Sequence, residues 1–155
     1  LYGGKHPVRF TGSAHDQEAY ITKKPGVLGP LNRHLIDKIN NHVDEISMVK
    51  TDLEDGAKTL LLSYGVTAGS MREAVTQARA RGTKVSAITV QSLWPVPEKE
   101  ILAAAAGIER IVVAELNPGL YLRELERLLP DLEIVGIPRI DGVLIPPTQL
   151  LEAIV

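Results

Sequence analysis

The chain has 155 residues, of which 45% are hydrophobic and 23% are charged, and its formal net charge is -2. This length and apolar content suffice for one buried core. The near-neutral charge, without a long basic run, argues against nucleic acid or an anionic membrane surface as a partner. The absence of cysteine excludes disulfides and cysteine-ligated iron–sulfur clusters. No window approaches the roughly 18 to 20 apolar residues that span a bilayer, so we expect a cytoplasmic protein.

The first part of the chain predicts an arm and a helix. Because the sequence begins at Leu1 and not at methionine, we expect a carboxyl-terminal piece of a longer protein. Residues 1–29 are rich in Gly, Pro, His and Lys, which is typical of an extended arm or linker after an upstream domain. Apolar residues then recur at helical spacing and predict an amphipathic helix over about residues 30–46: Leu31, Leu35, Ile39, Val43 and Ile46.

Strands and helices alternate through the rest of the chain. Short apolar runs predict strands at residues 60–64, 84–90, 110–115 and 133–137. Helical patterns predict one helix capped by Ser70 with Glu73 and closed by Gly82, and others at residues 97–106, 121–129 and 148–154. This alternation requires right-handed crossovers. Residues 30–155 therefore predict a three-layer α/β/α domain with a mainly parallel sheet that starts near residue 45.

The turn after the first predicted strand is a candidate anion site. Gly65 and Gly69 bracket this turn, which also contains Thr67 and Ser70, and its backbone amides lead into a helix amino terminus. Neither a G-x-G-x-x-G fingerprint nor a phosphate loop is present, and the second strand ends without a ribose-binding acid, which argues against independent NAD binding. We favour the simpler interpretation that Gly65 permits a tight turn and Ser70 caps the helix.

Glu115, Asn117 and Gly119 follow the third predicted strand, at the edge where α/β proteins usually bind ligands. A lone carboxylate has no acid–base partner at a fixed spacing, so catalysis would need companions from elsewhere. We therefore favour a role for Glu115 in capping the next helix or in pairing across an interface. No catalytic residue is predicted.

Trp94 and the histidines also predict structural or interface roles. Trp94 lies in a stiff, proline-rich loop, and we expect it to anchor that loop to the core or to a partner surface, in preference to stacking on a ligand. The four histidines, at positions 6, 15, 34 and 42, form no compact metal-binding pattern, so no metal site is predicted. His15 and Asp16 are expected at an interface of the arm.

Six segments together resemble a known family, the alpha subunits of 2-oxoacid:ferredoxin oxidoreductases. In chain order they read GSAHD (12–16), SYGVTA (63–68), REAV (72–75), SLWPVPE (92–98), VAELNPG (113–119) and DG (141–142). The similarity is to the carboxyl-terminal, transketolase C-terminal-like domain of that subunit and extends from about residue 12 to the end.

The resemblance implies a whole-enzyme reaction in which a 2-oxoacid is oxidatively decarboxylated with coenzyme A, giving acyl-CoA, carbon dioxide and reduced ferredoxin. Thiamine diphosphate and magnesium would be bound mainly by the beta subunit with the upstream domain of the alpha subunit, and iron–sulfur clusters elsewhere. This chain lacks the Gly-Asp-Gly…Asn thiamine motif, so we expect it to bind none of these cofactors alone and to be inactive alone. Gly65, Thr67, Glu115 and Asn117 are implied interface or ligand-edge residues, with coenzyme A as one ligand.

The chain departs from the family pattern at three positions. Gly69 and Leu120 replace a frequent Arg and Gln, and Gln17 replaces the Glu that often follows the His-Asp pair. Two alternatives remain open. The chain is either the equivalent domain of a thiamine-dependent 2-oxoacid dehydrogenase or transketolase, or a module that binds a phosphate ligand on its own. The sequence does not name the 2-oxoacid.

Overall fold

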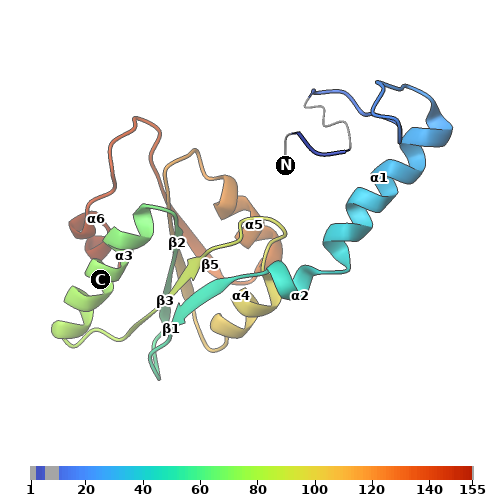
Figure 1. Cartoon of the computed structure of the whole chain (residues 1–155). Helices are drawn as coiled ribbons and strands as arrows, with labels where there is room; N and C mark the ends of the chain where they lie inside the picture. The colour runs from blue at the N-terminus through green and yellow to red at the C-terminus, as the bar shows by residue number, and fades with distance from the viewer. Residues whose placement is uncertain (1–2, 6–10, 155) are drawn as a thin grey trace. The chain divides into compact units, whose positions relative to one another are not determined.

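The computed structural model describes residues 3–5 and 11–154, so the predicted arm is described in part and His6 lies outside the described residues. The chain divides into two compact units, Leu1–Val43 and Asp44–Val155. The second unit contains the sheet (Figure 1). None of the helices in this described part of the chain is long and apolar enough to cross a bilayer.

A five-stranded sheet forms the centre of the second unit, in the order β1-β3-β2-β4-β5. The strands are β1 (Val49–Asp52), β2 (Thr59–Tyr64), β3 (Val85–Val90), β4 (Arg110–Glu115) and β5 (Glu133–Pro138). The strands β2 to β5 run parallel, which confirms the predicted sheet, and β1 pairs antiparallel with β3. The sequence does not predict β1, because this edge strand has four residues, two of them charged, and only Val49 is partly buried.

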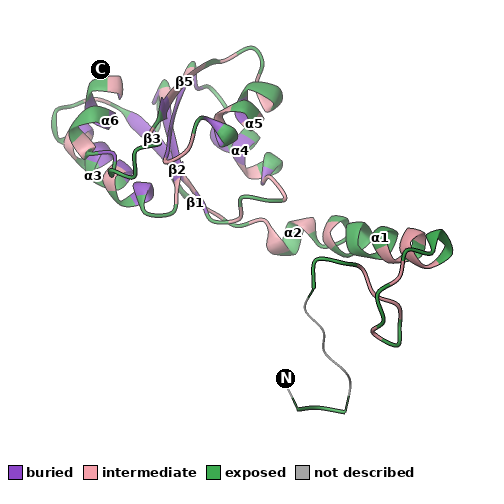
Figure 2. Cartoon of the chain, turned by 90° about the horizontal axis from the view of Figure 1, so that it is seen from above, coloured by how far each residue is buried: buried purple, intermediate pink, exposed green. Residues whose placement is uncertain are grey.

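Helices cover both faces of the sheet (Figures 1 and 2). One face carries α3 (Thr67–Ala80) and α6 (Pro147–Ile154), and the other carries α4 (Glu98–Ala104) and α5 (Leu120–Leu128). Successive side chains of a strand point to opposite faces, so Leu61 of β2 joins the core beneath α3 and α6, whereas Leu60 and Leu62 join the core beneath α4 and α5. The predicted three-layer α/β/α arrangement is confirmed.

Arg79, near the end of α3, holds the edge strand on the sheet. Its guanidinium lies 2.8 Å from Asp52 (Nη1 to Oδ1) and 2.6 Å from Glu54 (Nε to Oε2). It also donates a hydrogen bond to the carbonyl of Val85 at the start of β3 (2.8 Å). Since β1 buries little apolar surface, the hydrogen bonds from Arg79 to the carboxylate and carbonyl of Asp52 and the ion pair with Glu54, just after the strand, link β1 to α3.

The first unit contains a small hairpin and a long helix, and here the prediction is partly wrong. α1 extends over Pro25–Asn40, and a turn separates it from the short α2 (Val43–Ile46), so there is no single helix over residues 30–46. Pro25 lies in the first turn of α1, where the missing N–H of proline has no cost. No described residue of this unit is buried (Figure 2). Its apolar stripe therefore contacts no core of its own.

Candidate functional site

The carboxyl ends of β2 and β4 lie side by side at one edge of the sheet. Ser63 pairs with Ala114 across these parallel strands, so the next residues, Tyr64 and Glu115, meet at the same edge. The hydroxyl of Ser63 also donates to the carbonyl of Ala114 (2.9 Å). The register thus brings together two polar side chains that are 51 residues apart in the sequence.

Glu115 is almost completely buried, with 1% of its surface exposed, and the fold uses both oxygens of its carboxylate. Oε2 accepts from the hydroxyl of Tyr64 (2.8 Å) and the backbone N–H of Tyr121 (3.0 Å), and Oε1 accepts from the N–H of Leu122 (3.0 Å). The two amides belong to the first turn of α5, whose free N–H groups and dipole stabilise a negative charge. Glu115 therefore caps α5, as the capping interpretation expects.

Asn117 organises the turn between β4 and α5. Its Oδ1 accepts from the N–H groups of Gly119 (3.0 Å) and Leu120 (2.8 Å), and its Nδ2 donates to the hydroxyl of Tyr64 (2.5 Å). Gly119 has a φ of +90°, in the left-handed region that favours glycine, and occupies the N-cap position of α5. Together Asn117 and Glu115 accept from the N–H groups of residues 119–122, the four that a helix start leaves unpaired.

Tyr64 joins these two side chains into one network. Its hydroxyl donates to Glu115 and accepts from Asn117, and its ring packs on that of Tyr121 with the centroids 5.6 Å apart. Burial raises the pKa of Tyr64 to about 12, with the hydrogen bond to Glu115 and the charge of Glu115 acting in the same direction and Asn117 opposing them. Tyr64 therefore keeps its proton at neutral pH and is a poor general base or acid there.

Tyr64 and Tyr121 are residues of this edge to which the sequence assigns no role. Burial also raises the pKa of Tyr121, and its buried hydroxyl has no hydrogen-bond partner among the described residues. The available signal is local: Tyr64 ends a strand and Tyr121 begins the helix after Gly119. The contact of Tyr64 with Glu115 and its packing on Tyr121 depend on the order of the strands and are not visible in the sequence.

The turn after β2 differs from its predicted arrangement. α3 begins at Thr67 with Val66 in the N-cap position, so Ser70 lies inside the helix, and the prediction that Ser70 caps it is wrong. Gly65 has a φ of +56°, as the tight-turn interpretation expects. Thr67 is buried, whereas Gly69 is exposed. The roles of Gly65, Thr67, Gly69 and Ser70 at a ligand edge stay predictions.

Trp94 does not anchor its loop to the core of this chain. Its side chain is 70% exposed, so the core half of that prediction is wrong. Val96 packs on the core instead, and the Oγ of Ser92 donates to the carbonyl of Ile46 and accepts from the N–H of Met48. These contacts hold the loop, and the indole ring of Trp94 stays exposed. The other half of the prediction, contact with a partner surface, stays a prediction.

His15 and Asp16 lie in the hairpin of the first unit. Oδ1 of Asp16 accepts from the backbone N–H groups of Glu18 (3.1 Å) and Tyr20 (2.9 Å), a bonding pattern typical of a turn-forming aspartate. The ring Nε2 of His15 lies 3.1 Å from Oγ1 of Thr11. The two residues therefore shape the hairpin, and their predicted interface role stays a prediction.

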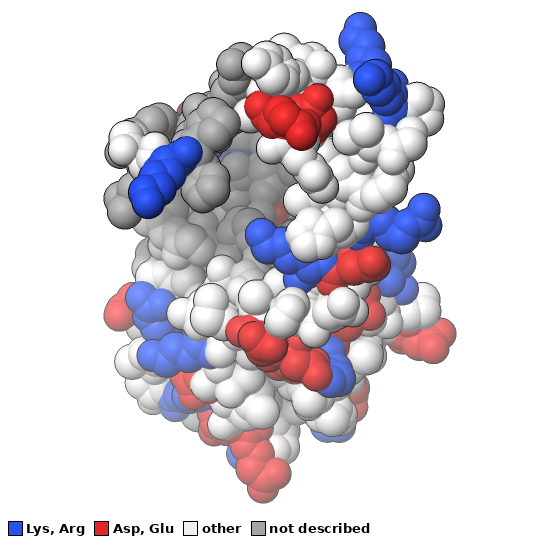
Figure 3. All heavy atoms as spheres, turned by 45° about the vertical axis from the view of Figure 1, so that its right-hand side comes forward, with Lys and Arg blue, Asp and Glu red and all other residues white. Residues whose placement is uncertain are grey.

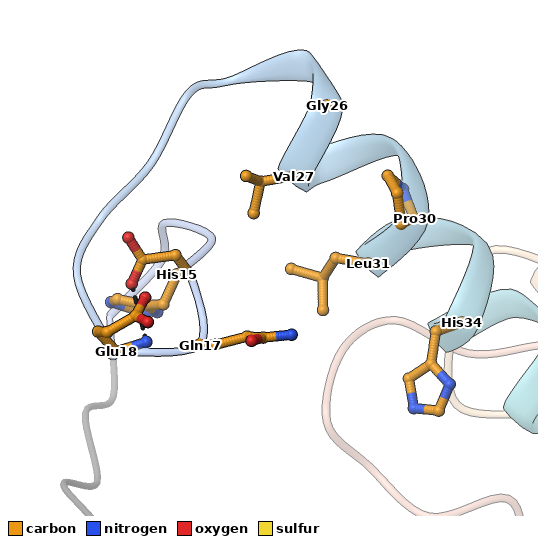
Figure 4. Close-up of a pocket in the computed structure, with 9 residues that line it drawn as sticks. His15, Gln17, Glu18, Gly26, Val27, Pro30, Leu31 and His34 are labelled. Carbon is orange, nitrogen blue, oxygen red and sulfur yellow. Dashed lines mark hydrogen bonds between the residues drawn. The ribbon is translucent and has the colours of Figure 1, made fainter.

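The hairpin and α1 border an open hollow of about 630 Å³ within the first unit (Figure 4). Val27 and Leu31 point from α1 toward the hollow, and His15 and Glu18 lie on the hairpin opposite them. Over residues 3–5 and 11–154, no group of three His, Cys, Asp or Glu side chains is placed to hold a metal ion.

Charged side chains of both signs are interspersed on the face drawn in Figure 3. Ion pairs neutralise several charged side chains of the chain, such as Lys58 with Glu109 (2.8 Å) and Lys99 with Asp44 (2.7 Å). A nucleic-acid site requires a concentrated basic patch, and this face presents none among the described residues.

The chain is similar to enzyme subunits. The family described as pyruvate:ferredoxin oxidoreductase core domain II matches residues 57–150. The 2-oxoglutarate synthase subunit KorA of Methanothermobacter marburgensis is 33% identical over 155 residues, which cover 99% of this chain and 41% of that protein. The chain thus spans about two fifths of the length of this relative.

Solved structures share the fold. The 2-oxoglutarate:ferredoxin oxidoreductase from Magnetococcus marinus, determined with 2-oxoglutarate, coenzyme A and succinyl-CoA bound, aligns with a TM-score of 0.75 at 23% identity, over 97% of this chain and 26% of that chain. A split gene transketolase, an inactive beta4 tetramer, aligns with a TM-score of 0.55 at 16% identity, over 68% of this chain and 40% of that chain. These likenesses support the transketolase C-terminal-like fold. The family match over residues 57–150 and the similarity to the KorA subunit show that the chain belongs to the core domain II family of the 2-oxoacid:ferredoxin oxidoreductase alpha subunits.

Proposed function

We propose that this chain serves as domain II in the alpha subunit of a 2-oxoacid:ferredoxin oxidoreductase. The complete enzyme would decarboxylate a 2-oxoacid oxidatively with coenzyme A and pass two electrons to ferredoxin, releasing acyl-CoA and carbon dioxide. The observation that carries this proposal is the similarity to the KorA subunit along 99% of the chain. Because that relative is a 2-oxoglutarate synthase subunit, we propose 2-oxoglutarate as the 2-oxoacid.

Within the enzyme we propose a structural role for this domain, in assembly with the beta subunit and the upstream domain. The closed network of Tyr64, Glu115 and Asn117 supports this role, because the side chains at the sheet edge bond to each other and to the start of α5. We propose that this chain alone holds neither thiamine diphosphate with magnesium nor an iron–sulfur cluster, in keeping with the lack of cysteine and of a group of three His, Cys, Asp or Glu metal ligands among the described residues. Those groups would be held by other parts of the enzyme, as would the site for ferredoxin.

We also propose that this domain contacts coenzyme A. The turn from Gly65 to Ser70 leads into α3, whose N-cap residue Val66 makes no side-chain capping hydrogen bond. The N–H groups of Ala68 and Gly69 donate to the carbonyls of Gly65 and Val66 (3.3 and 3.1 Å), so a phosphate would be held mainly by the amides that precede them. Phosphate groups are stabilised at such positions. Calorimetric titration of the chain with coenzyme A tests this contact, and the absence of heat at millimolar ligand would count against it.

The enzymatic proposal is tested with the complete alpha subunit and its beta subunit. We expect reduction of ferredoxin, or of a viologen acceptor, that requires both coenzyme A and 2-oxoglutarate and is faster with 2-oxoglutarate than with a branched 2-oxoacid. The 155-residue chain alone should show no turnover with the same reagents. Transfer of the acyl group to lipoamide instead of coenzyme A, with no reduction of ferredoxin, would replace this proposal by the 2-oxoacid dehydrogenase alternative.

A further inference from the structure

The two methionines of the chain lie in opposite environments. Met48, in the loop before β1, has 55% of its surface exposed. Met71 lies in α3 with 1% of its surface exposed and belongs to the core beneath α3 and α6. Because the chain contains no cysteine, these two thioethers hold its only sulfur atoms. One methionine is therefore open to oxidants in solution and the other is not.

The backbone of Met48 is fixed although its side chain is exposed. Its N–H donates to Oγ of Ser92 (3.2 Å), and its carbonyl accepts from the N–H groups of Gln91 (2.9 Å) and Ser92 (3.1 Å). Strand β1 begins at the next residue, where Val49 pairs with Val90. None of these contacts involves the sulfur atom of Met48, so a chemical change at the sulfur leaves them in place.

Packing protects Met71 from the same change. It shares its core with Val75 of α3, Leu61 of β2 and Leu150 of α6, all of them buried. An oxidant in solution reaches such a side chain only through an opening of the fold, and core elements open least often. Oxidation of Met71 therefore reports unfolding, whereas oxidation of Met48 requires none.

We propose that Met48 is a site of reversible oxidation by hydrogen peroxide. One peroxide oxygen bonds to the thioether sulfur, the O–O bond breaks and the second oxygen leaves as water, so that the sulfur is oxidised by two electrons to a sulfoxide. A methionine sulfoxide reductase reverses the change: it removes the oxygen as water and oxidises two thiols to a disulfide. The site does not depend on the enzymatic function proposed above.

Oxidation of Met48 changes the polarity of the surface around it. A sulfoxide is polar, whereas the thioether is apolar. Through Ser92, Met48 is joined to the loop that carries Trp94, whose side chain is 70% exposed. The sulfoxide therefore places a hydrogen-bond acceptor next to this loop, and the backbone contacts that hold the loop remain.

Peptide mass spectrometry of the native chain after treatment with hydrogen peroxide tests this proposal. The sulfoxide should form at Met48 at least about 10-fold faster than at Met71, because Met71 reacts only when the core opens. Methionine sulfoxide reductases, one for each epimer, should return Met48 to the thioether. The chain oxidised at Met48 should keep its circular dichroism spectrum. In urea that unfolds the chain, the two methionines should react at equal rates.

Met48→Leu and Met71→Leu are the matched variants. The first should abolish the fast reaction, and the second should leave it unchanged. Equal rates at the two methionines of the folded chain would overturn the proposal, as would a sulfoxide at Met48 that unfolds the chain or that the reductases do not repair. Protection of Met48 in the complete alpha subunit with its beta subunit would also overturn it, because the site must be open in the assembled enzyme.

Discussion

The two units of this chain differ in what holds them together. In Asp44–Val155, two layers of apolar side chains pack against the two faces of the sheet, and residues such as Leu60 and Ile111 are fully buried. In Leu1–Val43, none of the described residues is buried, although α1 has sixteen residues and a regular apolar stripe. Helical periodicity alone therefore does not produce a core. A helix of this length owes most of its stability to the surface on which it packs.

The largest expected loss of stability comes from a cavity in the core of the second unit. Ile111→Ala removes a fully buried side chain beneath α4 and α5 and should lower the free energy of unfolding by about 3–4 kcal/mol. Leu35→Ala on α1 is the matched change in the first unit, where the side chain is 51% exposed, and should cost less than about 0.5 kcal/mol. Urea unfolding followed by circular dichroism measures both. Equal losses in the free energy of unfolding would show that α1 has a buried face and would contradict the stated difference between the two units.

A second prediction concerns the edge strand of the α/β unit. Arg79→Met keeps the length of the side chain but leaves the buried Oε2 of Glu54 without its cation, so unfolding should become easier by about 2 kcal/mol. Amide hydrogen exchange of β1 should accelerate more than that of β2. Lys58→Met breaks the exposed pair with Glu109 and should change stability by less than about 0.5 kcal/mol. If the two variants were alike, Arg79 would not hold β1.

Two tyrosines at the sheet edge provide a smaller and more selective test. Tyr64→Phe removes a hydroxyl that bonds to Glu115 and Asn117 and should cost about 1–1.5 kcal/mol. Tyr121→Phe removes a buried hydroxyl without a partner among the described residues, so it should be neutral or slightly stabilising. Thermal unfolding of both variants measures the difference, and the reverse order would contradict the network.

The same tyrosine predicts a dependence on alkaline pH. The folded state raises the pKa of Tyr64 from 10.0 to about 12, so the unfolded chain loses this proton at a lower pH than the folded chain does. The contribution of Tyr64 to stability is therefore complete below about pH 10 and is lost as the pH rises toward about 12. Urea unfolding at pH 9, 10 and 11 should show a steeper fall for the native chain than for Tyr64→Phe. Parallel curves would mean that the Tyr64 pKa is not raised.

The sequence predicts the parallel sheet well and its surroundings less well. Buried parallel strands are continuous apolar runs, so β2 to β5 are visible in the sequence, whereas β1 contains two charged residues and owes its place to Arg79. The start of α1 is missed because Pro30 suggests a helix start, while Pro25 provides the actual one. Local patterns do not reveal which of two prolines the fold uses.

At the candidate site the sequence locates the edge but not its bonding. Glu115 and Asn117 are visible because they follow an apolar run, and the capping interpretation needs only the helix that comes next. The contact with Tyr64 requires the strand order, which places β2 beside β4. For Trp94 the error has another cause: Val96 and Ser92 hold the loop, so the large aromatic residue is not needed for that purpose.

Replacing Glu115 in the complete enzyme tests most directly whether the sheet edge is structural and not catalytic. In Glu115→Gln one carboxylate oxygen becomes an NH₂ group that faces hydrogen-bond donors, so we predict a loss of about 2 kcal/mol in stability. At a temperature where the variant is folded, its kcat for 2-oxoglutarate should stay within about twofold of the native value. An unchanged melting temperature together with a kcat lowered about 100-fold or more would contradict this account and make Glu115 a catalytic residue.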